Sequence, residues 1–453
     1  MRRRPRGTLV AVVAAASVAL SSCSVHSTSG SGANGIRTPD QAVSSNADAD
    51  RGLTKSTITI GAIAYKEDTF ASFGLASLGG KPVEQIIKPF VDDINEHGGI
   101  AGRQLVVPIT RFSPIVPADQ QTACVDQADD KKVFATIGIA LYGADGERCL
   151  ASKQTPVLTS NSSSLESLKG DAGWVHQISM AKDRIAKNWV DWLIASGAAT
   201  PASKIGLLHS DDPEDNILVD QVLLPYLKQR GLKVVAQAAF SGLTIDTVTS
   251  AAQNAALKFR DTGVDLVLPD LDFLRFFVFL GAANSAGLKP RYSVSDLGQL
   301  SASATTNFYP SSFGGTKGVT AYTPAITGPP TVPDSPAFRD CLNIYQAHGQ
   351  QLSTDPTNRL AEVLQIGQYC ESLTLVAQLA KLAGPHLNRA SFSHAYAKLG
   401  TWSYRVTLTG PLTFGPNKFD GPDQYAVIQW QANCGAGDVS CYREIQPFKK
   451  GNW

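Results

Sequence analysis

The sequence predicts an α/β protein built from two doubly wound parallel-sheet lobes. Short apolar runs alternate with amphipathic segments of helical period, and this alternation occurs in two successive blocks. Such alternation is typical of parallel sheets covered by helices on both faces. The roughly 400 residues that follow residue 55 also exceed what one ordinary hydrophobic core accommodates, so two lobes are expected.

The first block begins with an expected strand at 57–63, where the sequence reads TITIGAI. A helix is expected at 82–97, because apolar residues recur at helical spacing and the segment stops at Gly98 and Gly99, a C-terminal glycine signal. The remaining elements expected in this block are strands at 104–109, 133–139 and 155–160 and a helix at 120–131.

The second block repeats the same alternation. Its expected strands are 204–209, 233–239, 264–269 and 291–294, and its expected helices are 217–230, 248–260 and 273–286. Ligands of open parallel sheets bind outside the carboxyl ends of the strands. Two facing lobes would therefore place both sets of strand ends on one cleft.

Residues 1–22 have the pattern of a signal peptide. The basic stretch MRRRPR precedes an apolar run at 7–20, and this run of about 14 residues is shorter than the roughly 20 that a membrane span requires. The ending Leu20-Ser21-Ser22-Cys23 resembles the lipobox of bacterial lipoproteins. That resemblance implies cleavage before Cys23 and attachment of lipid to it. Ordinary signal cleavage beside an unmodified cysteine is the alternative, and export by the twin-arginine route is a weaker variant.

Residues 23–55 are interpreted as the lipidated cysteine followed by a flexible tether, because 24–50 are rich in small and polar residues and cannot bury a core. The net charge of +1 argues against a nucleic-acid partner. Six further cysteines, an even number in an oxidising compartment, predict disulfides. Pairing of neighbours gives Cys124–Cys149, Cys341–Cys370 and Cys434–Cys441. Free buried thiols are the alternative, and no cysteine or histidine spacing indicates a metal site.

Several segments resemble the type I periplasmic solute-binding proteins, and more narrowly the branched-chain amino acid receptors. The most specific is PFVDDINEHGGIAGRQLVV at 89–107, which follows ITIGAI at 58–63. Further segments are FATIG at 134–138, GPLTF at 410–414 and QYAVIQW at 424–430. Their order and spacing carry the resemblance, which covers most of 56–432.

The resemblance implies a type I fold whose lobes are joined by a three-segment hinge. Lobe one would comprise 56–178 with 325–410, and lobe two 179–322 with 412–453. The lobes would close around a small polar ligand, an amino acid or a related metabolite, and deliver it to an ABC permease. From this resemblance together with the lipobox-like ending at Cys23, we expect an exported, lipid-anchored monomer at the outer face of the cell membrane, without cofactor or metal.

In relatives, the ligand carboxylate meets hydroxyls and N–H groups at a helix start, and Ser162 and Ser164 align with these positions. Ser163 and Glu166 fit a capping box there, and a helix start of this kind suits an anion. The alternative is that these serines only cap a helix. A second family contact, the loop after the third strand, lacks its usual hydroxyl; Tyr142 could supply a hydroxyl or a flat wall there, or Gly143 a backbone N–H.

Acids of lobe two would meet the ligand's ammonium group. Asp296 aligns with one such position, with a solvated loop acid as the alternative. The other is Asp183, although a one-residue gap would place Lys182 there instead. Asp272 stands where relatives often carry an aromatic residue, and Phe73 where they place one over the ligand, with core packing as its alternative.

The acidic loop at 210–215 could attract a cation, but entry into a helix explains it better, because acids favour helix N-termini. No hydrolase, metalloprotease or phosphate-loop motif is present, so the chain is not expected to be an enzyme. His209, at a strand end, is the one histidine expected near the cleft, and a hydrolase would require a nucleophile beside it. A ligand sensor that acts on a membrane or cell-wall partner without transport is the nearer alternative.

Overall fold

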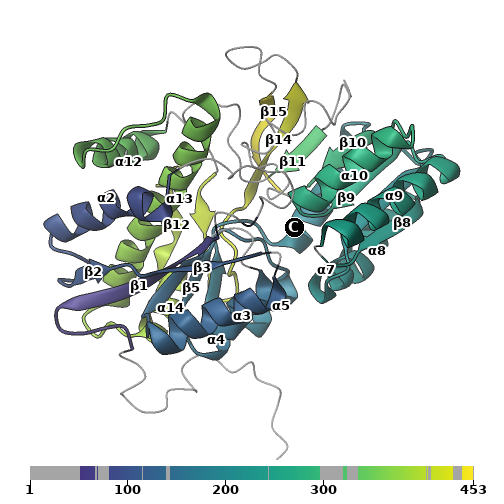
Figure 1. Cartoon of the computed structure of the whole chain (residues 1–453). Helices are drawn as coiled ribbons and strands as arrows, with labels where there is room; N and C mark the ends of the chain where they lie inside the picture. Colours follow the sequence, from purple (N-terminus) through teal and green to yellow (C-terminus); the bar gives the residue numbers. More distant parts are fainter. Residues whose placement is uncertain are drawn as a thin grey trace, which may run out of the picture. The chain divides into compact units, whose positions relative to one another are not determined.

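The computed structural model describes residues 51–66, 69, 81–114, 116–138, 143–242, 244–295, 320–323, 335–404, 406, 410–431 and 441–451. These residues form an α/β structure organised by two large sheets, as the sequence predicts (Figure 1). Among them, no helix is both long and apolar enough to cross a membrane.

The first sheet has six strands, and every pairing within it is parallel. Its order is β2-β1-β4-β5-β6, and β3 also pairs with β1. The strands are β1 (Thr57–Tyr65), β2 (Gln104–Val106), β3 (Ile109–Phe112), β4 (Ala135–Gly138), β5 (Val157–Thr159) and β6 (Val175–Gln177). The single strand expected at 104–109 is therefore two strands. Pro108 lies between them, and a proline has no N–H to donate to a continuous ladder.

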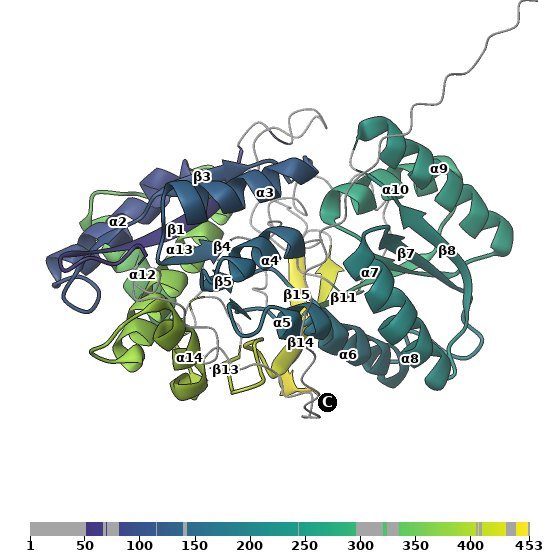
Figure 2. The same ribbon diagram turned by 90° about the horizontal axis from the view of Figure 1, so that it is seen from below.

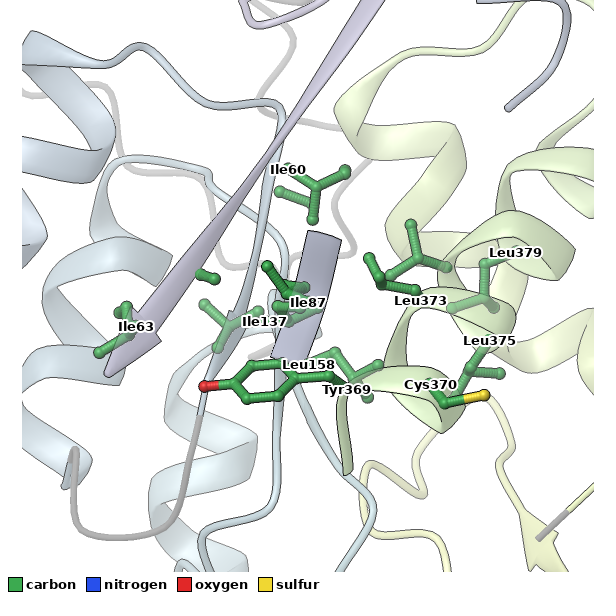
Figure 3. Packing of buried hydrophobic residues seen from close by; sticks show 14 of the residues in the cluster. Ile60, Ile63, Ile87, Ile137, Leu158, Tyr369, Cys370, Leu373, Leu375 and Leu379 are labelled. Atoms are coloured by element: carbon green, nitrogen blue, oxygen red, sulfur yellow. The ribbon is translucent and has the colours of Figure 1, made fainter. Parts of the chain in front are cut away.

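Helices from two separate parts of the sequence, 83–170 and 336–399, pack with the first sheet around one hydrophobic core. They are α2 (Val83–Glu96), α3 (Pro117–Val125), α4 (Ala144–Ser152), α5 (Leu165–Gly170), α12 (Pro336–Ala347), α13 (Pro356–Ala383) and α14 (Arg389–Leu399). Figure 3 shows Ile137 and Leu158 of the sheet packed beside Tyr369 and Leu373 of α13. We call the first sheet and these helices lobe 1.

The second sheet has seven strands in the order β15-β14-β11-β10-β9-β7-β8. They are β7 (Ile205–Ser210), β8 (Val234–Phe240), β9 (Leu266–Asp270), β10 (Arg291–Val294), β11 (Thr320–Thr323), β14 (Gln424–Gln431) and β15 (Cys441–Lys450). The strands β7 to β11 pair parallel with one another, but β14 pairs antiparallel with both β11 and β15. The predicted parallel arrangement therefore holds from β7 to β11, and the antiparallel strands β14 and β15 extend this edge of the sheet.

The helices of the second sheet are α6 (Lys182–Ala195), α7 (Pro213–Leu218), α8 (Leu224–Gln229), α9 (Ile245–Thr262) and α10 (Phe273–Ser285). α9 and α10 pack against each other beside β8 and β9 (Figure 1), whereas α6 lies beside α8 (Figure 2). We call the second sheet and these helices lobe 2. Its apolar residues form two clusters, one around α9 and α10 and the other around α6 and α8.

Two helices expected to be regular contain π-helical turns. The helix expected at 120–131 is α3 followed by η3 (Asp126–Asp130), and the helix expected at 217–230 is α7, η4 (Val219–Leu223) and α8. A π-helical turn inserts an i→i+5 pattern and often accompanies a functional site. η4 matters for the pocket described below, because its last residue, Leu223, lines one wall.

Two of the expected disulfides are present, which confirms those pairings. Cys124 of α3 is bonded to Cys149 of α4, and Cys341 of α12 to Cys370 of α13. The third expected pair includes Cys434, which lies outside the described residues, as does Cys23. A two-stranded sheet of β12 (Thr401–Trp402) and β13 (Leu412–Thr413) completes the described strands.

Candidate functional site

The first turn of α5 lies where the sequence places an anion-binding helix start. Ser164 is the N-cap residue, and its Oγ accepts a hydrogen bond from the N–H of Ser167 at 3.1 Å. The capping box expected from Ser163 and Glu166 is therefore wrong by one residue. Ser163 instead points inward, where its Oγ donates to Glu147 at 3.1 Å.

Side-chain carboxylates of lobe 2 occupy the free N–H groups of this turn. The N–H of Ser164 donates to Oε1 of Glu214 at 2.6 Å, and the N–H of Leu165 donates to Oδ2 of Asp183 at 2.8 Å. An anion is the expected partner of a helix N-terminus. Here the protein supplies that anion itself.

Lys182 is the cation at the start of α6, and it is surrounded by acids. Its Nζ donates to Oδ1 of Asp215, and both side chains are largely buried. Although desolvation opposes the charged form, the carboxylates of Asp215, Glu214 and Asp270 raise the pKa of Lys182 well above its ordinary value. Lys182 is thus a fixed positive charge that is already neutralised by a neighbour.

A small pocket that is partly open to solvent lies beside Lys182. Its polar lining consists of Ser162, Lys182, Asp270 and Ser295. Its apolar lining consists of Ile185, Ala186, Trp189, Leu218 and Leu223. Apolar walls with a few convergent polar groups are the usual composition of small-molecule sites.

The pocket draws on both lobes and on strand ends. Ser162 follows β5 of lobe 1, whereas Asp270 ends β9 and Ser295 follows β10 of lobe 2. This is the carboxyl edge of both parallel arrays, where ligands of such sheets bind. The pocket therefore lies where the strand order predicts a site.

A second group of carboxylates lies behind the first turn of α5. Glu147 of α4 is 1% exposed, and desolvation raises its pKa to about 8 although Thr159 and Ser163 donate to it. Desolvation also raises the pKa of Asp171 to about 6. Glu147 is therefore largely a neutral acid at pH 7.

The structure places the predicted site residues at several different positions. Ser162 and Lys182 line the pocket, whereas Ser164 and Asp183 are engaged at the first turn of α5. Gly143 precedes α4 with φ of +85°, a left-handed conformation that favours glycine. Tyr142, Phe73 and Asp296 lie outside the described residues.

Asp272 has a structural role at the start of α10. Its Oδ1 accepts hydrogen bonds from the N–H groups of Leu274 and Arg275, both at 3.0 Å, as an N-cap residue does. The guanidinium of Arg275 also lies 3.2 Å from its Oδ2 and donates to Ser210 at 2.6 Å. The ring of His209 is buried, with its Nδ1 2.9 Å from the carbonyl oxygen of Ser210.

Sequence reasoning missed Glu214, Asp270 and Ser295. The loop at 210–215 does lead into a helix, as favoured, because Pro213 begins α7. Glu214 of the same segment also contacts lobe 1, where its carboxylate accepts a hydrogen bond from the N–H of Ser164. Asp270 and Ser295 each stand at the carboxyl end of a predicted strand, and that position could have identified them.

Comparison with known proteins agrees with this architecture. The sequence profile of a family described as periplasmic binding protein matches residues 57–436. A search of curated proteins found no match.

Solved structures with a similar fold include a fatty acid ABC transporter substrate-binding protein from Thermomonospora curvata (16% identity, 89% of this chain and 94% of that chain, TM-score 0.65). A solute-binding protein of an ABC transporter from R. palustris in complex with 4-hydroxybenzoate shares 16% identity over 87% of this chain and 98% of that chain (TM-score 0.64). An ABC transporter substrate-binding protein from Desulfitobacterium hafniense in complex with Leu shares 16% identity over 86% of this chain and 100% of that chain (TM-score 0.58). At these identities the likeness concerns the fold.

Proposed function

Because the chain belongs to the periplasmic binding protein family, we propose that it captures a small polar solute between its two lobes and delivers it to an ABC permease. The observation that carries this proposal is the pocket at the strand ends. Ser162 of lobe 1 and Lys182, Asp270 and Ser295 of lobe 2 line the same hollow. A ligand held by both lobes favours the closed state by its differential affinity for it.

The solute is an amino acid or a related small metabolite in this proposal. The structures of similar fold were solved with leucine and with 4-hydroxybenzoate, and one is a fatty acid binder. These ligands share a small polar head and an apolar body. A pocket with four polar residues at its rim and apolar walls suits the same general type of molecule.

We further propose that the protein is exported and anchored by lipid on Cys23 as a monomer, and that it catalyses no reaction. The lipobox-like Leu20-Ser21-Ser22-Cys23 supports the anchor. His209, the histidine considered for catalysis, directs its Nδ1 toward a backbone carbonyl, in keeping with a structural role.

A thermal-shift screen tests the binding function. Amino acids, amines, amides, peptides, sugars, aromatic acids and fatty acids would each be added to the purified chain from residue 24 onward. A true ligand raises the melting temperature by mass action, by an amount that grows with its concentration. Ser162→Ala should weaken this response, and the exposed Ser152→Ala on α4 is the matched control. If no solute of any class shifts the melting temperature, the proposed function is wrong.

Uptake measurements separate delivery from sensing. Cells that lack the chain should lose accumulation of the labelled ligand, and the wild-type gene should restore it. Unchanged accumulation together with a lost transcriptional response would instead indicate a sensor. For the anchor, wild-type chain should incorporate a clickable fatty acid and fractionate with membranes, and Cys23→Ser should do neither.

A further inference from the structure

The pocket beside Lys182 has two chemically different parts, an apolar wall and a polar rim formed by Ser162, Lys182, Asp270 and Ser295. We propose that the apolar part of the ligand enters the wall region between α6 and η4, and that its polar end is a basic amine. This inference rests on the proposed solute-binding function and narrows the class of solute.

The wall of the pocket is apolar and is formed by residues of α6, α7 and η4. Ile185 and Trp189 come from α6, and Leu218 and Leu223 come from the end of α7 and the π-helical turn. The i→i+5 pattern of that turn brings Leu218 and Leu223, five residues apart, to one side. Trp189 is held in place, because its Nε1 donates to Oγ of Ser293 at 2.8 Å in the interior.

Ser162 and Ser295 show that the rim is prepared for a polar group. These residues are 9% and 4% exposed, and both line the pocket. Within the part of the chain that the structure describes, neither hydroxyl has a hydrogen-bond partner. A serine hydroxyl both donates and accepts, so a hydroxyl that lines the pocket can bond to the polar group of a ligand.

The charge of the rim selects a cation over an anion. Lys182 is the positively charged member of the lining, and Asp215 already pairs with it. A carboxylate placed there would have to displace Asp215 and approach Asp270. An amine would instead approach Asp270, a carboxylate that already stabilises the charge of Lys182, and carboxylates favour a cation in a partly buried site.

The first turn of α5 leads to the same conclusion. Its N–H groups at Ser164 and Leu165 would be the receptor for a ligand carboxylate, and they are bonded to Glu214 and Asp183. A ligand without a carboxylate leaves these bonds intact. A free amino acid would have to break the Ser164–Glu214 bond before its own carboxylate could replace Glu214.

Two sets of compounds test the inference by calorimetry at pH 7, and the members of each set share one apolar group and differ in their polar end. One set is 3-methylbutylamine, leucine and 4-methylpentanoate, and the other is 2-phenylethylamine, phenylalanine and 3-phenylpropanoate. We expect the amine of at least one set to bind at least ten-fold more tightly than its acid and its amino acid. Methylamine, which lacks the apolar body, should bind at least ten-fold more weakly than that amine.

Two variants locate the binding. Ala186→Leu fills the apolar wall and should weaken the amine at least ten-fold, whereas Ala195→Leu, at the exposed end of the same helix, should not change its affinity. Asp270→Asn should also weaken the amine at least ten-fold, and Asp265→Asn, which is about half exposed just before the same strand, serves as the matched control. Melting temperatures and circular dichroism check that each variant folds.

The outcomes are distinct. Tighter binding of the acid or the amino acid than of the amine would overturn the amine assignment and leave the solute-binding function intact. Binding of the amine that neither Ala186→Leu nor Asp270→Asn weakens would overturn the pocket assignment. If none of these compounds binds but a solute of another class raises the melting temperature in a saturable way, the amine inference alone is overturned. If no solute of any class binds, the proposed function itself is overturned.

Discussion

Oε1 of Glu214 accepts a hydrogen bond of 2.6 Å from the backbone N–H of Ser164. Glu214 belongs to α7 of lobe 2 and Ser164 caps α5 of lobe 1. Asp183 makes a parallel contact to the next N–H of the same turn. Two carboxylates of lobe 2 thus stabilise one helix start of lobe 1, and they favour the arrangement in which the two lobes are in contact.

Removal of the Glu214 carboxylate should shift the chain toward separated lobes. A hydrogen bond to a charged group contributes about 1.5–3 kcal/mol when buried, and about 1 kcal/mol for a partly exposed side chain. Glu214→Ala should therefore lower the ratio of closed to open molecules about five-fold. Small-angle X-ray scattering would show this as a larger radius of gyration. The exposed Glu166→Ala, in the same turn of α5, should leave the scattering curve unchanged; an equal effect of both variants would contradict the assignment.

Ionisation of the buried Glu147 carboxyl should lower the free energy of unfolding as the pH rises. Burial raises its folded pKa to about 8, well above the value of an exposed glutamate, so the folded state holds a proton that the unfolded state releases. The stability from this proton is fully present below the unfolded pKa near 4.5 and is lost as the pH rises through about 8. Each pH unit in that window lowers the free energy of unfolding by up to about 1.4 kcal/mol.

Urea unfolding at pH 5, 6, 7 and 8 measures this dependence. Glu147→Gln keeps a neutral acceptor for Ser163 and removes the ionisation, so its curve should be flatter and its stability at pH 8 higher than that of the wild type. Asp145→Asn, on the same helix with a 76% exposed side chain, should retain the wild-type slope. Asp171 contributes in the same direction up to a pH of about 6.

The strands and amphipathic helices could be predicted from the sequence because each carries its own periodic pattern. The strand expected at 57–63 is found as Thr57–Tyr65, and the helix expected at 82–97 as Val83–Glu96. The 28-residue α13 was missed because apolar side chains surround it rather than forming a single stripe. Buried on most sides, such a helix lacks the amphipathic signal on which sequence reasoning depends.

The site was less predictable, because its contacts depend on how distant segments meet. Ser162 and Lys182 could be identified from their places after a strand and at a helix start. The bond between Ser164 and Glu214 joins residues 50 positions apart, and no local pattern encodes it. Glu214 was interpreted as a helix-entry acid, which describes its backbone but not the direction of its side chain.

The two disulfides should contribute comparable amounts to stability. Cys124–Cys149 and Cys341–Cys370 close loops with sequence separations of 25 and 29 residues. A cross-link of this loop length stabilises by about 3 kcal/mol, mainly by restricting the unfolded chain. Cys124→Ser with Cys149→Ser, and separately Cys341→Ser with Cys370→Ser, should each lower the free energy of unfolding by about this amount in urea titrations. A negligible loss in either double variant would show that its loop is already restricted in the unfolded state.

Arg184 and Asp420 form a buried ion pair whose disruption should be costly. Their side chains are 8% and 2% exposed, and the second Nη of Arg184 also bonds to Asp423. Asp420 further accepts a hydrogen bond from the N–H of Ala181 at 3.0 Å, so the pair fixes the start of α6 to the segment before β14. Removal of one partner leaves the other charge buried, which costs about 3–5 kcal/mol.

A double-mutant cycle in urea separates the pair from its surroundings. Arg184→Met and Asp420→Asn should each destabilise strongly, and the double variant should be less destabilised than the sum of the two, because neither charge then remains buried alone. The exposed pair Arg260 and Asp261, 2.9 Å apart, is the control. Its coupling free energy should stay below about 1 kcal/mol, as for other surface pairs. Additive effects at Arg184 and Asp420 would mean that Asp423 and Lys418, which lie beside them, replace the lost partner.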